Sequence, residues 1–244
     1  LSGVLRVDHV MALTRLYWIP HGMALDEGTY VDYPTEELFA VLSLESHRAR
    51  CEVVGENLGT VPREIDEALP RHRIWGMFLA EFEAMGETVR APSADQVALI
   101  GTHDTPTLAG WVAGVDIGER VRCHLLDAEA APTELEARIE GAERLAALLG
   151  TSVDDLPGLL AEVLEWLGRS PSPLVIPWIE DLWLEGEQVN LPGTRSSERP
   201  NWQRPMARLL DDVLADPEVE ARIRRLRRAR AEAPPPSTTP KPEL

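Results

Sequence analysis

Residues 51–62, CEVVGENLGTVP, decide how the fold of this chain is predicted. The apolar run of residues 53–55 stops at a carboxylic acid and an amide, Glu56 and Asn57. A short apolar run without strict alternation is typical of a strand that is covered on both faces. Glu56 therefore stands at the end of a predicted strand. It is either the point where that strand runs into solvent or an acid at the rim of an active site.

Four further apolar runs of this kind occur along the chain, at residues 3–10, 75–82, 96–102 and 173–179. Helix-like segments follow two of the runs. Residues 35–49 have acidic side chains in the first turn and apolar ones at helical spacing, and residues 63–69 follow a proline. The alternation of strands and helices predicts an α/β fold with a parallel sheet.

Residues 105–170 differ from this alternation. They contain two amphipathic segments, 132–149 and 156–168, and a partly periodic one at 108–117. We interpret this stretch as a helical insertion between the last two predicted strands.

The C-terminal part divides into an Arg-rich helix, 216–232, and a Pro-rich tail, 233–244, which is predicted to be disordered. Six arginines lie between residues 222 and 230. Such a run is either an anion or nucleic-acid patch or, more commonly, a solvated helix face.

Composition narrows the class of protein. The 244 residues are 44% hydrophobic, which suffices for a sizeable core, and the net charge of −17 argues against nucleic acid or an anionic membrane as the main partner. No apolar stretch reaches the roughly 18 residues that span a bilayer, and residues 1–20 lack a signal-peptide core. Cys51 and Cys123 lie far apart and form no CxxC motif, so no disulfide framework is predicted. This fits a reducing compartment, and we expect a cytoplasmic protein.

Carboxylates end three of the predicted strands. Asp8 ends the first run, Glu56 the second and Asp104 the fourth. In a parallel barrel the carboxyl ends of the strands share one face, so the three groups are expected to converge there. Arg6 points to the same side of its strand as Asp8 and would favour the ionised form of that acid.

Paired carboxylates of this kind suit retaining glycoside chemistry, in which a nucleophile and an acid/base lie roughly 5–5.5 Å apart. Plainer interpretations exist for each group. Arg6 and Asp8 would also make a structural ion pair, Glu56 would also suit a helix start, and Asp104 would also cap the helix that follows it.

A metal site is a further alternative. Asp8, His9, Glu56, His103 and Asp104 are the ligand types of a barrel metallohydrolase. The chain has no H-x-H or other close pairing of ligands, so no metal is predicted.

Three motifs resemble the catalytic segments of the α-amylase superfamily. LRVDHV (5–10) resembles its nucleophile segment, VVGENLG (53–59) its acid/base segment and IGTHD (100–104) its third-carboxylate segment. Residues 17–34, GTVP at 59–62 and NLPGTRSSERPNW at 190–202 narrow the resemblance to the 4-α-glucanotransferases, also called amylomaltases or disproportionating enzymes, of glycoside hydrolase family 77.

The resemblance implies a (β/α)8 TIM barrel, of which residues 1–215 would supply about strands four to eight. The chain begins at Leu1, inside a predicted strand, so we expect a C-terminal piece of a longer protein. Because five strands cannot close a barrel, the isolated fragment is expected to be inactive.

The resemblance also implies residue roles. Asp8 matches the nucleophile, Glu56 the general acid/base and Asp104 the stabiliser of the transition state. His103 matches a sugar-binding neighbour, and Arg6 matches the arginine that supports the nucleophile.

Asn190 and Trp202 match a family segment near the donor side, so the resemblance implies either that they bind substrate or that they belong to a structural loop over the barrel. Tyr30, with Tyr17 and Trp18, is expected to stack on acceptor sugars or to pack under a loop.

The implied activity is retaining transfer of α-1,4-glucan segments to the 4-hydroxyl of an acceptor glucan or glucose through a covalent glycosyl-aspartate. The expected partners are α-1,4-glucans and maltooligosaccharides, with no cofactor, metal, nucleic acid or membrane, and the oligomeric state stays open. The alternatives are an α-glucan hydrolase or debranching enzyme, or an inactive truncated glycan-binding fragment.

Overall fold

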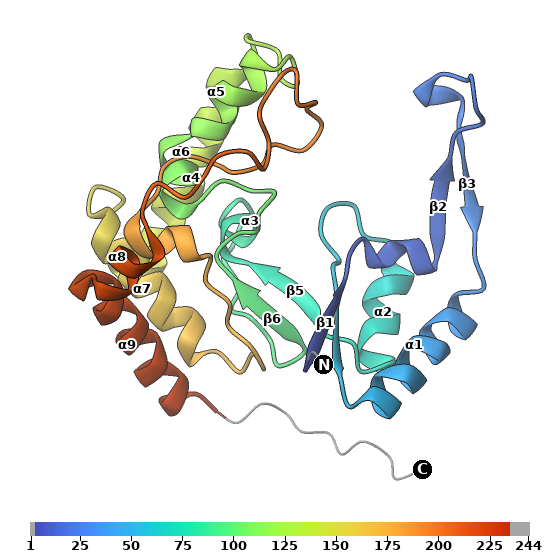
Figure 1. Ribbon diagram of the computed structural model, residues 1–244, viewed down its shortest axis with the longest axis horizontal. Coiled ribbons are helices and arrows are strands. Elements are labelled where there is room, and N and C mark those ends of the chain that lie inside the picture. The colour runs from blue at the N-terminus through green and yellow to red at the C-terminus, as the bar shows by residue number, and fades with distance from the viewer. Residues whose placement is uncertain (1–2, 235–244) are drawn as a thin grey trace. The chain divides into compact units, whose positions relative to one another are not determined.

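The structure is a computed structural model that describes residues 3–234 (Figure 1). It has two compact units. Unit 1 consists of the described residues up to Met77 together with Asp95–Val97, and unit 2 of Phe78–Ala94 and the described residues from Ala98 onward. The predicted tail at 233–244 lies outside the described residues from position 235 on.

Unit 1 is organised by a parallel pair of strands, β1 (Val4–Val7) and β4 (Glu52–Gly55). Their register pairs Val4 with Glu52 and Val7 with Gly55. A parallel bridge joins Trp75 to Val54 on the other side of β4. The predicted parallel arrangement is therefore confirmed for the strand that ends at Glu56.

Two helices and a 3-10 turn cover this pair: α1 (Thr35–Ala49), α2 (Arg63–Arg71) and η1 (Val10–Leu13). The bounds of α1 are those expected from its acidic first turn and apolar spacing. The buried core of unit 1 consists of Val10, Met11, Phe39, Val53, Ile65, Ala68, Leu69 and Ile74.

An antiparallel hairpin, β2 (Arg15–Trp18) and β3 (Thr29–Asp32), completes unit 1. The apolar pattern of residues 15–32 does not predict these two strands. A long connection, which contains the 3-10 turn η2 (Leu25–Glu27), replaces the two-residue turn that signals a hairpin. The side chains of β3 are exposed, so no buried face imposes an alternating pattern.

The strands β5 (Gly76–Leu79) and β6 (Gln96–Leu99) form a two-stranded sheet, and the division between the units runs through both. Their flanking hydrogen bonds advance in step, from Gly76 N–H to Asp95 O (2.9 Å) and from Glu81 N–H to Ile100 O (3.2 Å). The two strands therefore run in the same direction.

The prediction of a strand at residues 173–179 is wrong in extent. Only a parallel bridge forms, between Val175 and Ala98, with hydrogen bonds from Ala98 N–H to Leu174 O and from Ile176 N–H to Ala98 O, both 2.9 Å. Pro173 and Pro177 flank this bridge, and proline has no N–H with which to extend a ladder.

Unit 2 is mainly helical and includes residues 105–170, where helical segments were predicted. Its helices are α3 (Ala80–Ala84), α4 (Leu108–Ala113), α5 (Val115–Arg122), α6 (Ala131–Leu149), α7 (Leu156–Arg169), the 3-10 turn η3 (Ile179–Trp183), α8 (Leu210–Ala215) and α9 (Pro217–Glu232). Gly114, at φ 67°, ends α4 and separates it from α5. Leu145, Leu160 and Leu164 are fully buried in the hydrophobic core of unit 2. None of the helices within residues 3–234 has the length and hydropathy to cross a membrane.

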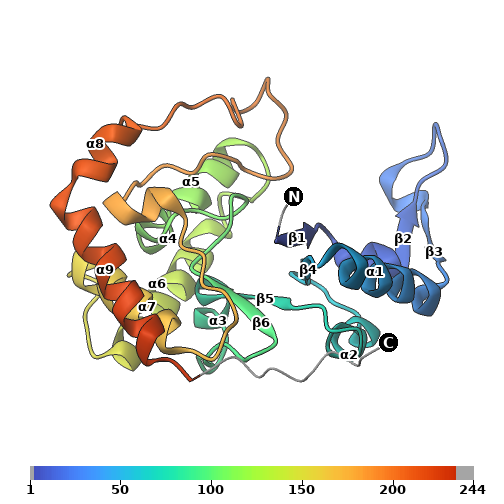
Figure 2. The same cartoon turned by 60° about the horizontal axis from the view of Figure 1, so that its bottom comes forward.

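The Arg-rich helix α9 packs along α7 (Figures 1 and 2). Arg225 pairs with Glu165 and with Glu162 at 2.6 Å, and Arg222 donates to the carbonyl of Leu182 at 2.7 Å. These arginines are thus engaged in holding the helix against its neighbours.

The contact between α7 and α9 depends on a glycine. A Cβ at Gly168 would lie 2.7 Å from the Cβ of Ala229. We expect Gly168→Val to lower the free energy of unfolding by about 1–3 kcal/mol, because overpacking forces the two helices apart. Urea denaturation of the whole protein measures this change.

Gly118→Val on α5 is the matched control, since no atom lies within 4 Å of a Cβ there. It should change stability by less than about 0.5 kcal/mol. Equal effects of the two substitutions would contradict the packing argument.

Candidate active site

Glu56 is fixed at the carboxyl end of β4. Its backbone continues the pairing with β1, through hydrogen bonds with Val7 O and Val10 N–H, both 2.9 Å. Its side chain is largely buried. One carboxyl oxygen accepts from the backbone N–H of His9 at 2.7 Å and the other from that of Leu58 at 2.8 Å. The carboxyl group is thus held from both sides by main-chain donors.

Asp8 follows the end of β1 and directly precedes the residue that holds Glu56. Its Oδ1 is 2.8 Å from Nη1 of Arg6, and 75% of its side chain is exposed. An exposed ion pair of this kind contributes about 0–1 kcal/mol to stability, so its main effect is on the orientation of the carboxylate. His9 itself adopts the left-handed conformation, at φ 43°, which turns its N–H toward Glu56.

Gly55 makes room for this arrangement, because a Cβ there would lie 2.9 Å from a methyl group of Val10. Asn57 on the far side of Glu56 accepts a hydrogen bond from Met77 N–H at 2.8 Å through its side chain. Unit 1 therefore brings together Arg6, Asp8 and Glu56, three of the predicted site residues.

In unit 2, Asp104 lies in a tight turn after β6. Thr102 N–H donates to the hydroxyl of Thr105 at 2.8 Å, and Asp104 N–H donates to the hydroxyl of Thr102 at 3.2 Å. The turn needs Gly101, since a Cβ at this position would collide with Thr105 and lie 2.7 Å from Oε2 of Glu81.

Three other predicted residues lie next to Asp104: Asn190 and His103 contact its carboxylate, and Trp202 contacts His103. Asn190 donates to its Oδ1 at 2.6 Å, and His103 Nε2 lies 3.2 Å from its Oδ2. The His103 ring in turn lies 5.4 Å from that of Trp202 and 6.4 Å from that of Trp178. Unit 2 therefore brings together His103, Asp104, Asn190 and Trp202.

Tyr30 belongs to the hairpin of unit 1. Its ring makes an edge contact with Tyr17 at 5.2 Å, and the guanidinium of Arg15 lies 4.4 Å from its centroid. Tyr30 as a whole residue is 57% exposed. Neither of these contacts joins Tyr30 to Asp8 or Glu56.

Two buried acids beside the Asp104 turn were not assigned a role from the sequence. Glu81 and Asp181 are almost fully buried, and neither oxygen of Glu81 has a hydrogen-bond partner among the described residues. Burial, and then the nearby Asp181, raise the pKa of Glu81 well above its usual value. A lone acid inside the apolar run 75–82 was the sequence signal for such a group.

Burial also raises the pKa of Asp181 to about 7, against the hydrogen bond that its Oδ1 accepts from Leu108 N–H at 2.7 Å. The charge of Glu180 adds to the rise. Burial and neighbouring negative charge thus stabilise the neutral form of each group relative to its ionised form.

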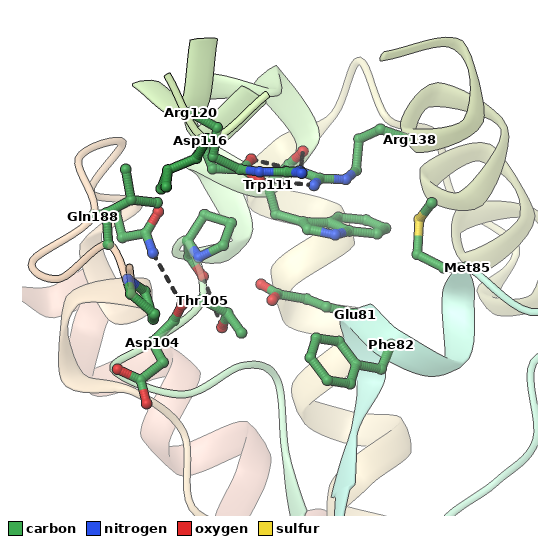
Figure 3. Close-up of a pocket in the computed structure, with 14 residues that line it drawn as sticks. Glu81, Phe82, Met85, Asp104, Thr105, Trp111, Asp116, Arg120, Arg138 and Gln188 are labelled. Atoms are coloured by element: carbon green, nitrogen blue, oxygen red, sulfur yellow. Dashed lines mark hydrogen bonds and ion pairs between the residues drawn. The ribbon is translucent and has the colours of Figure 1, made fainter. Parts of the chain in front are cut away.

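Glu81 points into a pocket of ≈ 320 Å³ that reaches Asp104 (Figure 3). Across the pocket the carboxylate of Asp116 makes a two-pronged ion pair with Arg138, at 2.8 and 3.0 Å, and the guanidinium lies 5.3 Å from the Trp111 ring centroid. This pair satisfies two charges that would otherwise be costly to bury.

Metal ligation finds no support in the side chains of residues 3–234. No three or more of their His, Cys, Asp and Glu side chains lie together in a way that could hold a metal ion.

The chain is similar in sequence to a known protein family. Residues 1–211 match the family described as 4-alpha-glucanotransferase. The chain is 34% identical over 230 residues to the 4-alpha-glucanotransferase of Haemophilus influenzae. The aligned region covers 88% of this chain and 33% of that protein. The corresponding protein of Mycobacterium tuberculosis is 31% identical over 235 residues, which is 88% of this chain and 32% of that protein.

Solved structures give the same result. An amylomaltase from Corynebacterium glutamicum matches with a TM-score of 0.79 at 27% identity, over 94% of this chain and 36% of that one. An amylomaltase from Streptococcus agalactiae in complex with acarbose matches in fold with a TM-score of 0.68 at 20% identity, over 95% and 42%. The chain thus spans about a third of the length of these relatives.

The buried acid Asp181 predicts a dependence of stability on pH. Its pKa is about 7 in the fold against 3.8 in the unfolded chain, so the folded form binds the extra proton. Stability relative to Asp181→Asn should therefore fall as the pH rises from about 4 to about 7 and then level off, at about 1.4 kcal/mol per pKa unit. The asparagine keeps the acceptor for Leu108 N–H.

Urea denaturation of both proteins at a series of pH values measures this difference. Asp154→Asn, at an exposed position before α7, is the control and should follow the wild-type profile. Parallel profiles for Asp181→Asn and the wild type would show that Asp181 stays ionised in the fold.

Proposed function

The chain belongs to the 4-alpha-glucanotransferase family, and on this premise we propose that the whole protein transfers α-1,4-glucan segments from a donor glucan to the 4-hydroxyl of an acceptor glucan or glucose. The observation that carries the proposal is the link between its two reacting groups. The main chain directly after Asp8 donates the hydrogen bond that fixes the carboxyl group of Glu56.

The fold supports this assignment. Amylomaltases, to which the chain is similar in structure, are TIM-barrel enzymes. The parallel pairings of β1 with β4, of Trp75 with Val54 and of Val175 with Ala98 suit successive strands of such a barrel. In the proposal the chain supplies about strands four to eight, with α4–α7 as the insertion before the last.

In the proposed mechanism, Glu56 gives a proton to the glycosidic oxygen as the bond to the anomeric carbon breaks. Asp8 attacks that carbon and forms a glycosyl-aspartate. Glu56 then takes the proton of the acceptor 4-hydroxyl, whose oxygen displaces Asp8. One glycosidic bond is broken and one is formed, so the number of reducing ends does not change.

The surroundings of the two groups fit these roles. Arg6 forms an ion pair with Asp8 at 2.8 Å and so orients the carboxylate proposed as the nucleophile. Glu56 is largely buried, whereas 75% of the Asp8 side chain is exposed. Two carboxyl groups in different environments are the usual basis for separate acid and nucleophile roles.

Asp104 is proposed to stabilise the transition state, and His103, Asn190 and Trp202 to bind the sugar. Asn190 and His103 fix the carboxylate of Asp104, and the exposed indole of Trp202 offers a flat apolar face. Tyr30, exposed on the hairpin, is assigned to the acceptor glucan.

The proposed substrate class is supported by the same relatives. The amylomaltase from Streptococcus agalactiae binds acarbose, so maltooligosaccharides are the expected partners of this protein as well.

Incubation of the whole protein with maltotriose tests the reaction type. We expect glucose and longer maltooligosaccharides to appear while the number of reducing ends stays constant. A net rise in reducing ends would instead identify an α-glucan hydrolase, and the absence of any product would favour a glycan-binding protein.

Glu56→Gln tests the assigned acid/base. It should lower the transfer rate by about 10²–10⁴-fold, because the amide neither gives nor takes the proton. Glu64→Gln, the same change at an exposed position on α2, should leave the rate unchanged. A fully active Glu56→Gln protein would exclude Glu56 as the acid/base.

A further inference from the structure

The guanidinium of Arg199 joins the two ends of one loop. This loop, residues 188–202, lies beside α5 and is drawn in orange in Figure 1. At its first end Arg199 donates to the carbonyls of Gln188 and Val189, the latter at 3.3 Å. At its second end it donates to the side-chain oxygen of Asn201 at 2.7 Å.

The same side chain is anchored outside the loop. Its Nε lies 3.1 Å from a carboxyl oxygen of Glu119 on α5, and only 11% of the Arg199 side chain is exposed. Arg122, and to a smaller degree Arg199, hold the pKa of Glu119 below its usual value. Glu119 is thus a counter-charge that Arg199 shares with Arg122.

Asn201 carries the connection into the loop. Its side-chain oxygen also accepts from Leu191 N–H at 3.1 Å, and its amide donates to the hydroxyl of Thr194 at 2.6 Å. The backbone of Trp202 closes the loop with a bond to Val189 O at 3.2 Å. Without Arg199 two carbonyls and one side-chain oxygen would lose their shared donor.

The loop carries the residues that meet the Asp104 turn. Asn190 donates to the carboxylate of Asp104. Gln188 donates to the Asp104 backbone carbonyl at 3.1 Å (Figure 3). Trp202 at the other end lies against His103. The position of these three contacts depends on the spacing between the two ends of the loop.

From this geometry we propose that Arg199 is a positioning residue, which holds loop 188–202 so that Asn190 and Trp202 meet the His103–Asp104 turn. The planar fork of arginine is required, because one side chain has to reach oxygens on both ends of the loop and Glu119 at once. The ammonium group of lysine has the charge without this reach. The inference rests on the proposed transfer activity.

The test uses the whole protein and the kcat/KM for transfer between maltotriose molecules. Arg199→Ala should lower it roughly 10- to 100-fold, as a misplaced binding group does. Arg199→Lys keeps the charge beside Glu119 and serves as the variant that preserves the fold. It should still lose roughly 10-fold.

Arg195→Ala is the matched control. Arg195 belongs to the same loop and is exposed. The hydrogen bond from Arg195 to the Glu198 carboxylate comes from the backbone N–H, which the substitution keeps. The substitution should leave kcat/KM within about 2-fold of the wild type.

A double-mutant cycle separates positioning from general stability. If Arg199 acts through Asn190, then Arg199→Lys should cost less than about 3-fold in an Asn190→Ala background. Losses that simply multiply would overturn the proposal, and so would full activity of Arg199→Lys. Failure of the proposed function is distinguishable, because the wild-type protein would then make no transfer products.

Discussion

The parallel pairing of neighbouring strands is the constraint on which both candidate clusters depend. Neighbouring strands that run in the same direction end at the same edge of the sheet. The residues that follow them are therefore close together in space. In unit 1, β1 and β4 end side by side, and the main chain after Asp8 reaches Glu56. In unit 2, the bridge between Ala98 and Val175 does the same for the residues that follow, as the contact of His103 with Trp178 shows.

The acids of the structure differ in how their charge is accommodated. Glu56 has a main-chain donor for each oxygen, and Asp8 has Arg6 and solvent. Glu81 has neither, although it is buried just beneath the Asp104 turn. A neutral carboxyl group there avoids the large cost of an unpaired buried charge. The turn that contains Asp104 therefore packs against Glu81, an acid whose neutral form is stabilised by the folded structure.

The loop 188–202 and the helices of unit 2 are held differently from the strands. Long side chains, rather than regular pairing, hold these parts in place. Arg199 spans the ends of loop 188–202, and Arg225 ties α9 to α7. Such contacts join residues far apart in sequence, and no spacing rule identifies them in advance. In the proposed arrangement, the contacts of Arg199 decide where Asn190 lies and thus whether it reaches the Asp104 carboxylate.

Local patterns in the sequence determined which segments become strands or helices and which side chains end them. Apolar runs located β1, β4, β5 and β6, acidic first turns and proline located α1 and α2, and the acids Asp8, Glu56 and Asp104 stood at the strand ends. The hairpin β2–β3 lacked a short turn and a buried face, and Pro173 and Pro177 cut the last strand to a bridge. Only the tertiary structure decided the partners of each acid, because hydrogen bonding, burial and charge depend on atoms that distant segments bring into contact.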